Sequence, residues 1–205
     1  MTRRPVIFND AAKSWVVSSS SSTDAHLIDK FHKGLPDYAP TPLRPLKQVA
    51  EELGLGAVYL KDESSRLGLP SFKILGASWG TFRAVAELLE LPLDADLEQA
   101  RQKVQAASVS LYAATDGNHG RAVAKMGSYL GAASVHIYVP HHLSDETVGL
   151  IQSEGAQVHR LRGSYDDAVN EAWVTSKKDK KGIFVQDTAF DGYEEIPKVR
   201  ANTIV

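Results

Sequence analysis

The strongest constraint on the fold is a regular alternation of apolar runs and amphipathic segments between about residues 105 and 188. The apolar runs are typical of buried strands, and the segments between them have helical spacing. We expect strands at 109–114, 134–139, 157–161 and 183–186, joined by helices at 118–130, about 145–154 and about 165–177. Strands that alternate with helices form parallel sheets through right-handed crossovers. The stretch therefore predicts a small doubly wound α/β unit.

Residues at the element ends support these limits. Gly131 and Gly155 follow two of the expected helices, where glycine commonly ends a helix. Ser144 can cap one helix, and Ser164 with Asp167 forms a capping-box-like start for the next. The alternation is therefore supported by local signals as well as by periodicity.

The chain before this unit gives weaker signals. Residues 46–53 predict a short helix closed by Gly54, residues 57–60 a strand, and residues 94–106 an amphipathic helix. The segment before this short helix is expected to be irregular because it contains four prolines: Pro36, Pro40, Pro42 and Pro45. We expect residues 93–188 to form the small domain. Residues 1–92 would be the N-terminal part of a larger α/β domain, with 1–40 flexible, and 189–205 would begin the return to it.

Composition narrows the functional classes. The 205 residues carry a net charge of −2, which gives no electrostatic case for binding nucleic acid or an anionic membrane. There is no cysteine, so neither disulfides nor a thiolate zinc site is available, and a cytoplasmic setting is favoured. No apolar run is long enough for a transmembrane helix, and the basic N-terminus lacks the apolar core of a secretory signal. The serines 18–22 predict a flexible or helix-capping segment, with a phosphorylation patch as the alternative.

Lys73 stands at the mouth of a helix expected over residues 74–90. Apolar residues along this helix are spaced for one buried face: Ile74, Leu75, Phe82, Val85, Leu88 and Leu89. The positive end of the helix dipole disfavours an additional positive charge, and burial acts in the same direction. The amine would then tend toward its neutral, nucleophilic form, which suits a Schiff-base lysine. The alternative is a solvated lysine in the first turn.

A second candidate site segment is the loop Thr115-Asp116-Gly117-Asn118-His119-Gly120, which joins a strand to a helix. Its two glycines would let backbone N–H groups approach a carboxylate or a phosphate. The loop matches neither common nucleotide fingerprint, and a plain tight turn with Asp116 as a helix cap is the alternative. Asp187 and Thr188 follow the fourth strand. Since ligands bind beyond the carboxyl ends of parallel strands, one site along this edge is expected.

Two motifs together carry a family resemblance. Ser71-Phe72-Lys73-Ile74-Leu75-Gly76-Ala77 and the loop from Ala114 to Gly120 resemble the fold-type II pyridoxal-phosphate enzymes. This tryptophan synthase β-like group includes serine/threonine dehydratases. Asp116 and the run Val185-Gln186-Asp187-Thr188-Ala189-Phe190-Asp191-Gly192-Tyr193-Glu194-Glu195-Ile196-Pro197 resemble, more narrowly, the diaminopropionate ammonia-lyases. The likeness extends from about Thr41 to Pro197.

The resemblance implies a role for each matching residue. Lys73 would bind pyridoxal phosphate as a Schiff base, and Asn118 would contact the ring oxygen of the cofactor. The loop backbone would receive the substrate carboxylate, at Thr115, Gly117, Asn118 and His119. Asp116 and Asp187 would be acid/base groups for the two stereoisomers of a small amino-acid substrate. A homodimer is implied for the full-length family, and no metal is implied.

The implied reaction is α,β-elimination of ammonia from 2,3-diaminopropionate, giving pyruvate and ammonia. A serine/threonine dehydratase is the enzymatic alternative, although dehydratases usually have a small or hydroxyl residue in place of Asp116. The family pattern continues beyond Pro197 with a glycine-rich phosphate loop and a partner for the pyridine nitrogen, whereas this sequence stops at Val205. We therefore expect a C-terminally truncated member, active only if the remainder is supplied. A non-catalytic fragment or interaction protein is the alternative of another class.

Several polar residues are expected to have ordinary structural roles. His141 and His142 are adjacent and predict surface imidazoles rather than a metal site. His119 is expected to pack at a helix start rather than act as a base. Residues 61–63 predict a polar cluster at a strand end, and Arg66 a surface or domain-contact side chain.

Overall fold

The computed structural model describes residues 14, 25–194 and 196–198, so the serines 18–22 lie outside the described residues. Its centre is a four-stranded parallel sheet with strand order β5-β4-β3-β6. The strands are β3 (Ser110–Ala114), β4 (Ser134–Pro140), β5 (Gln157–Leu161) and β6 (Gly182–Phe184). The predicted α/β class with a parallel sheet is confirmed.

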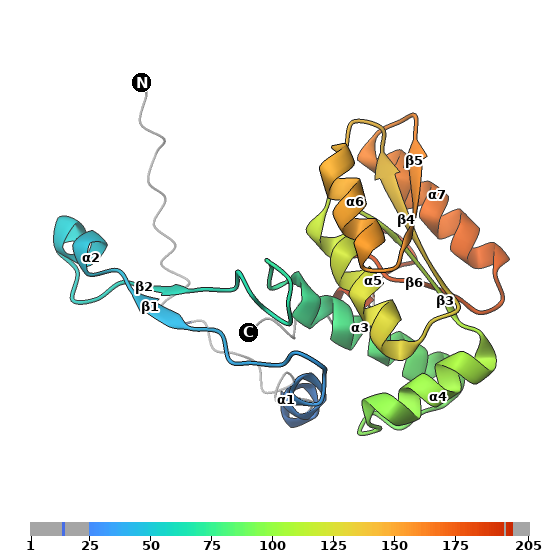
Figure 1. Ribbon diagram of the computed structural model, residues 1–205, viewed down its shortest axis with the longest axis horizontal. Helices are drawn as coiled ribbons and strands as arrows, with labels where there is room; N and C mark the ends of the chain where they lie inside the picture. The colour runs from blue at the N-terminus through green and yellow to red at the C-terminus, as the bar shows by residue number, and fades with distance from the viewer. Residues whose placement is uncertain (1–13, 15–24, 195, 199–205) are drawn as a thin grey trace.

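Helices cover both faces of this sheet (Figure 1). Helices α5 (Asn118–Leu130) and α6 (Asp145–Ser153) lie on one face, and α7 (Tyr165–Lys178) lies on the other. The predicted capping box at the start of α7 is present, because Ser164 and Asp167 exchange hydrogen bonds. No helix in the described part of the chain is both long enough and apolar enough to cross a bilayer.

Helix α3 (Lys73–Leu89) packs against α5 and carries Lys73 as its first residue. Its apolar face is fully buried at Ile74, Phe82 and Val85, as the spacing predicted. Leu88 is an exception, because 37 % of it remains exposed. Packing of α3 on α5 therefore fixes the position of Lys73 relative to the sheet.

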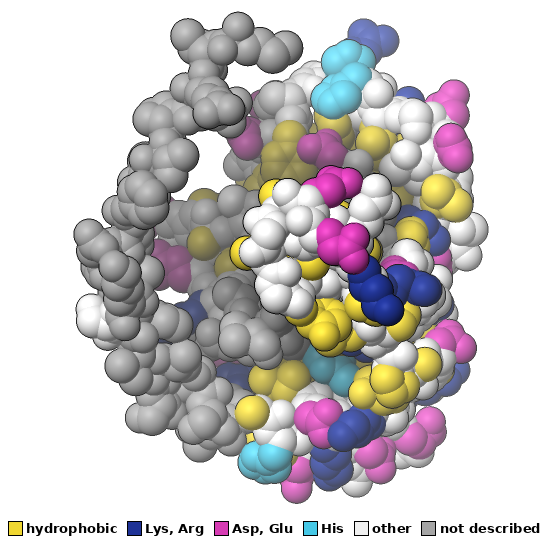
Figure 2. Space-filling view, turned by 90° about the vertical axis from the view of Figure 1, so that its left-hand side faces the viewer, with side chains coloured by type: hydrophobic (Ala, Val, Ile, Leu, Met, Phe, Trp, Pro, Cys, Tyr) yellow, Lys and Arg dark blue, Asp and Glu magenta, His cyan; other side chains and the backbone are white. Residues whose placement is uncertain are grey.

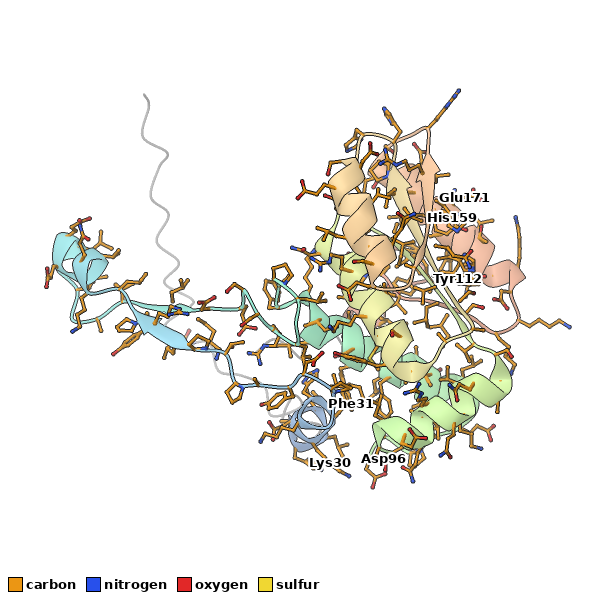
Figure 3. All side chains as sticks on the ribbon, viewed as in Figure 1. Lys30, Phe31, Asp96, Tyr112, His159 and Glu171 are labelled. Atoms are coloured by element: carbon orange, nitrogen blue, oxygen red, sulfur yellow. The ribbon has the colours of Figure 1, made fainter. Side chains whose placement is uncertain are left out.

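Two helices flank α3 in the sequence. Helix α4 (Leu97–Ala107) begins three residues later than the expected start at Asp94, because Asp96 caps it by accepting a hydrogen bond from the Gln99 N–H at 2.8 Å. Helix α1 (Ala25–Lys33) was not predicted. It packs on α3 through Phe31, whose ring lies 4.6 Å from that of Phe82, and Figure 3 shows this side chain pointing at α3. The 25–33 segment is therefore part of the core.

A hairpin projects from the rest of the molecule (Figure 1). Strand β1 (Leu43–Pro45) pairs antiparallel with β2 (Tyr59–Lys61), and α2 (Lys47–Leu53) lies between them. The sequence predicted no strand among the prolines, but Pro45 is tolerated because β1 has a neighbour on one edge only. Gly54 ends α2 with φ of 63°, as predicted. Figure 2 views this side and shows hydrophobic side chains among charged ones; Leu53 and Tyr59 are 63 % and 59 % exposed.

Candidate functional site

The site lies where β3 and β6 end. These strands are adjacent and parallel, with Tyr112 paired to Phe184, so their carboxyl ends meet at the same edge of the sheet. The loop from Thr115 to Gly120 leaves β3 there, and Asp187 follows β6. The structure therefore brings the two predicted site segments side by side.

Lys73 reaches this edge from α3. Its Nζ lies 3.0 Å from Oδ2 of Asp187, although the residues are 114 positions apart. The side chains are 41 % and 21 % exposed, so a small molecule can reach the amine. The argument from sequence for a neutral Lys73 amine considered only the helix dipole and burial. It did not include the Asp187 carboxylate, which attracts a cation at the Lys73 amine.

The loop after β3 is shaped by Thr115, which is 2 % exposed. Its hydroxyl oxygen accepts hydrogen bonds from the N–H groups of Gly117 at 2.9 Å and Gly120 at 3.0 Å. Gly117 has φ of 150°, which side-chain-bearing residues rarely adopt. A Cβ on Gly120 would overlap the Cγ2 of Thr115 and lie 2.9 Å from Ile137 Cγ2. The Thr115 hydroxyl thus serves the turn itself, and the ligand-binding role expected of the loop backbone stays a prediction.

The other loop residues separate into exposed and buried groups. Asp116 and Asn118 are exposed at the start of α5, where the first N–H groups of a helix have no carbonyl partner within the helix. His119 is buried, and its Nε2 is 2.8 Å from the carbonyl oxygen of Val185. His119 therefore ties the loop to the end of β6, in agreement with its expected packing role.

Two site residues escaped the sequence reasoning. Gln186 was assigned to the fourth strand, but β6 ends at Phe184 and the Gln186 side chain is fully buried beside Asp187. Tyr165, the first residue of α7, accepts a hydrogen bond from Gln186 Nε2 at 2.7 Å. The sequence did offer one signal for Gln186: its amide ends an apolar run and immediately precedes Asp187, a predicted site residue.

Burial is the main cause that raises the pKa of Tyr165. The negative charges of Asp187 and Asp116 act in the same direction, while hydrogen bonds from Thr188 and Gln186 oppose them. The phenol therefore stays protonated at neutral pH. Tyr165 belongs to the site because the Gln186 amide bonds both its hydroxyl, at 2.7 Å, and Asp187 Oδ1, at 3.4 Å.

The residues present fit the reactive end of an aldehyde cofactor such as pyridoxal phosphate. An accessible lysine amine can form a Schiff base, and the carboxylate 3.0 Å away can take up its proton. The start of α5 beside them suits an anion such as the substrate carboxylate. The chemistry of the donor set thus agrees with the cofactor that the resemblance implies.

Outside this site, Arg66 is 8 % exposed, so of its two expected roles the surface one is excluded and the domain-contact one stays a prediction. Its Nε lies 2.6 Å from Oε2 of Glu63. Its Nη2 also donates to Thr41 at 2.5 Å. His141 and His142 are exposed, as expected. Within residues 14, 25–194 and 196–198, no group of three or more acidic, histidine or cysteine side chains is placed to hold a metal ion.

Comparison with known proteins gives consistent matches. The family model described as pyridoxal-phosphate dependent enzyme matches residues 35–196. A diaminopropionate ammonia-lyase from Salmonella typhimurium is 39 % identical over 176 residues, which are 84 % of this chain and 43 % of that protein. The apo crystal structure of the Escherichia coli diaminopropionate ammonia-lyase superposes with a TM-score of 0.82 at 32 % identity, covering 91 % of this chain and 49 % of that one.

A further crystal structure of the Escherichia coli enzyme holds an aminoacrylate-PLP azomethine reaction intermediate. It matches with a TM-score of 0.76 at 32 % identity, over 91 % of this chain and 46 % of that chain. The present chain thus spans less than half the length of the curated relatives it matches.

Proposed function

Because the chain belongs to the pyridoxal-phosphate dependent enzyme family, we propose that it carries the reactive lysine of an ammonia-lyase acting on 2,3-diaminopropionate. The products would be pyruvate and ammonia. The observation that carries the proposal is the approach of Lys73 Nζ to Asp187 Oδ2 at 3.0 Å, beside the Asp116 loop. Pyridoxal phosphate is the cofactor of this family, and when bound it supplies an electron sink that acidifies the α-hydrogen of an amino acid.

Lys73 would first bind the cofactor and later move a proton. Its ammonium must lose a proton before the nitrogen can attack a carbonyl carbon, and Asp187 is placed to accept that proton. With cofactor and substrate both bound, the Lys73 amine would be free to remove the α-hydrogen from the face that it approaches. Asp116 and Asp187 would be the acid/base groups that, with Lys73 as the other base, serve the two stereoisomers.

Asp116 would supply the proton for the leaving group. Loss of the β-amino group needs a proton donor, since ammonia leaves far more easily than the amide ion. Asp116 stands exposed on the loop before α5, whose N–H groups would hold the substrate carboxylate. Asn118, in the first turn of α5, would face the ring oxygen of the cofactor. This arrangement would bring the carbon that loses its hydrogen next to the Lys73–Asp187 pair.

The carboxylate of Asp116 favours this reaction over that of a serine/threonine dehydratase, which removes a hydroxyl group. The relatives also favour it, because those that are more than 30 % identical are described as diaminopropionate ammonia-lyases. We further propose a cytoplasmic homodimer that acts on small amino acids, with residues 93–188 as its small domain. The contrasting hypothesis is a non-catalytic interaction protein that keeps the site residues without turnover.

The test begins with cofactor binding by the purified chain. Incubation with pyridoxal phosphate, then borohydride reduction and peptide mass spectrometry, should place the cofactor on Lys73. Lys73→Ala should abolish this adduct and the accompanying visible absorbance band. Lys33→Ala is the matched control, because Lys33 is also paired with an aspartate, at 2.6 Å from Asp29. A folded wild-type chain without adduct, or a band that survives Lys73→Ala, contradicts the assignment.

Turnover, measured with the remainder of the family pattern supplied, then identifies the reaction. Pyruvate release should be fastest from 2,3-diaminopropionate and much slower from serine or threonine. Faster release from serine or threonine would indicate the dehydratase. An adduct on Lys73 without release from any of the three would favour the non-catalytic alternative.

A further inference from the structure

Gln186 takes the place of a backbone carbonyl at the end of the sheet. The pairing of β3 with β6 ends at Tyr112 and Phe184, and two further residues along each strand would bring Ala114 opposite Gln186. There the side-chain Oε1 of Gln186 accepts a hydrogen bond from the Ala114 N–H at 3.0 Å. The amide thus extends the contact between the two strands to the residue that precedes the Thr115 loop.

The other end of the same amide faces the site. Gln186 Nε2 donates to the Tyr165 hydroxyl at 2.7 Å and to Asp187 Oδ1 at 3.4 Å. A backbone N–H requires an acceptor and a carboxylate requires a donor, so these partners fix the orientation of the amide. Gln186 is fully buried, and its backbone N–H donates to the Tyr193 hydroxyl at 2.7 Å. Hydrogen bonds to both the side chain and the backbone of Gln186 therefore fix its position.

We propose that Gln186, anchored by Tyr165, is a positioning residue that holds the carboxylate of Asp187 in line with Lys73 and with the loop after β3. This inference rests on the proposed function. Oδ2 of Asp187 contacts Lys73, whereas Oδ1 contacts Gln186. The Gln186 contact is independent of Lys73, so it can keep the carboxylate in place when the amine is engaged elsewhere.

Tyr165 serves as the anchor because it is the first residue of α7 and its partly buried hydroxyl accepts the 2.7 Å hydrogen bond from Gln186. Charged groups from three elements meet at this part of the site: Lys73 from α3 pairs with Asp187, and the charges of Asp187 and Asp116 both act on Tyr165 of α7. The protonated phenol adds no charge of its own beside Asp187. It thus holds the amide without competing with the carboxylate for Lys73.

The decisive measurement is the titration of the Asp187 carboxyl carbon by NMR in the chain without cofactor. A donated hydrogen bond favours the charged carboxylate, so its loss should raise the titration midpoint. Gln186→Met keeps the side-chain volume and removes the donor; we expect a rise of up to about one pH unit. Tyr165→Phe should cause a smaller rise. Tyr112→Phe is the control, because the Tyr112 hydroxyl bonds to Asp179 at the far end of α7.

Amide hydrogen exchange provides a second measurement. In Gln186→Met the Ala114 N–H loses its acceptor, so its exchange should accelerate at least roughly tenfold relative to Tyr112→Phe. The proposal is overturned if Gln186→Met leaves both the Asp187 midpoint and the Ala114 exchange at wild-type values. If only Tyr165→Phe behaves like the control, the anchoring role of Tyr165 is rejected.

A catalytic measurement separates this inference from the proposed function. Displacing Asp187 but not Asp116 should change the ratio of kcat/KM for the two enantiomers of 2,3-diaminopropionate, by about tenfold for Gln186→Met. A ratio does not depend on the amount of folded protein. An unchanged ratio in both variants contradicts positioning. If the wild type turns over neither enantiomer, the proposed function fails, while the titration and exchange data still decide the role of Gln186.

Discussion

Gly120 offers a sharp test of the loop geometry, because substitution to alanine has two opposing effects there. Gly120 lies in the first turn of α5, where alanine is intrinsically favoured over glycine by about 1 kcal/mol. The new Cβ would, however, overlap Thr115 Cγ2 and lie 2.9 Å from Ile137 Cγ2. Both neighbours are buried, at 2 % and 0 % exposure, so neither side chain can move into solvent.

Overpacking of this kind costs about 1–3 kcal/mol, and two immobile neighbours indicate the upper end of the range. Subtracting the helix preference of about 1 kcal/mol leaves a net destabilisation of about 2 kcal/mol. For a chain of this size, that corresponds to a fall in Tm of about 4–8 °C. The strain would also displace the Thr115 hydroxyl that accepts the Gly117 and Gly120 N–H groups.

Thermal and urea unfolding measure the effect, with Gly149→Ala as the matched control. Gly149 is also helical, in α6, but apart from its chain neighbours and the nearby backbone of α6 no described atom lies within 4 Å of its added Cβ. Only the helix preference remains there, so Gly149→Ala should stabilise the chain by about 0.5–1 kcal/mol. If Gly120→Ala is as stable as wild type, or matches Gly149→Ala, the close packing around the loop is wrong.

Three further outcomes follow from other contacts. Arg66→Ala should lower the free energy of unfolding by about 1.5–3 kcal/mol, because it removes a buried guanidinium that donates to the half-buried Glu63. The exposed Arg44, which pairs with Asp62, should matter by less than about 0.5 kcal/mol when replaced by alanine. Equal losses in denaturant titrations would contradict this. Burial lowers the pKa of His136 and of His159, whose Nδ1 and Nε2 lie 3.0 Å apart on the sheet face under α7 (Figure 3). As the pH falls below the ordinary histidine pKa of 6.5, the unfolded chain therefore binds more protons than the folded chain, and the free energy of unfolding should fall. In urea titrations His159→Gln should weaken this pH dependence, whereas His142→Gln, at an exposed histidine, should not. A wild type whose stability does not depend on pH would refute the argument. Asp116→Ala should reduce pyruvate release from 2,3-diaminopropionate by roughly 10²–10⁴-fold, the range for a lost general acid, and unchanged turnover would remove the main support for an ammonia-lyase.

Local signals allowed much of the sheet unit to be predicted. The limits of α5 and β5 agree with the expected ones, since apolar periodicity and cap residues are both strong there. The fourth strand was placed too late, because Val185 and Gln186 are as buried as strand residues although the regular ladder has ended. An apolar run predicts that residues are buried, but it does not show whether they are paired in a strand.

The irregular N-terminal region was harder to predict. Strand β1 exists only because Leu43–Pro45 pairs with Tyr59–Lys61, a contact between residues that a local pattern does not report. Helix α1 is likewise stabilised by Phe31 against α3. The division into domains near residue 92 stays a prediction, as do the individual roles of the site residues.

The sequence by itself determined the parallel α/β class, the motif around Lys73 and the glycine loop around Asp116, because each depends on residue types at short spacing. The tertiary structure alone decided that Lys73 lies 3.0 Å from Asp187 and that Gln186 joins Asp187 to Ala114 and Tyr165. These contacts depend on how α3 packs on α5 and on where β6 leaves the ladder. Both are set by the filling of a shared core, to which residues distant in the sequence contribute together.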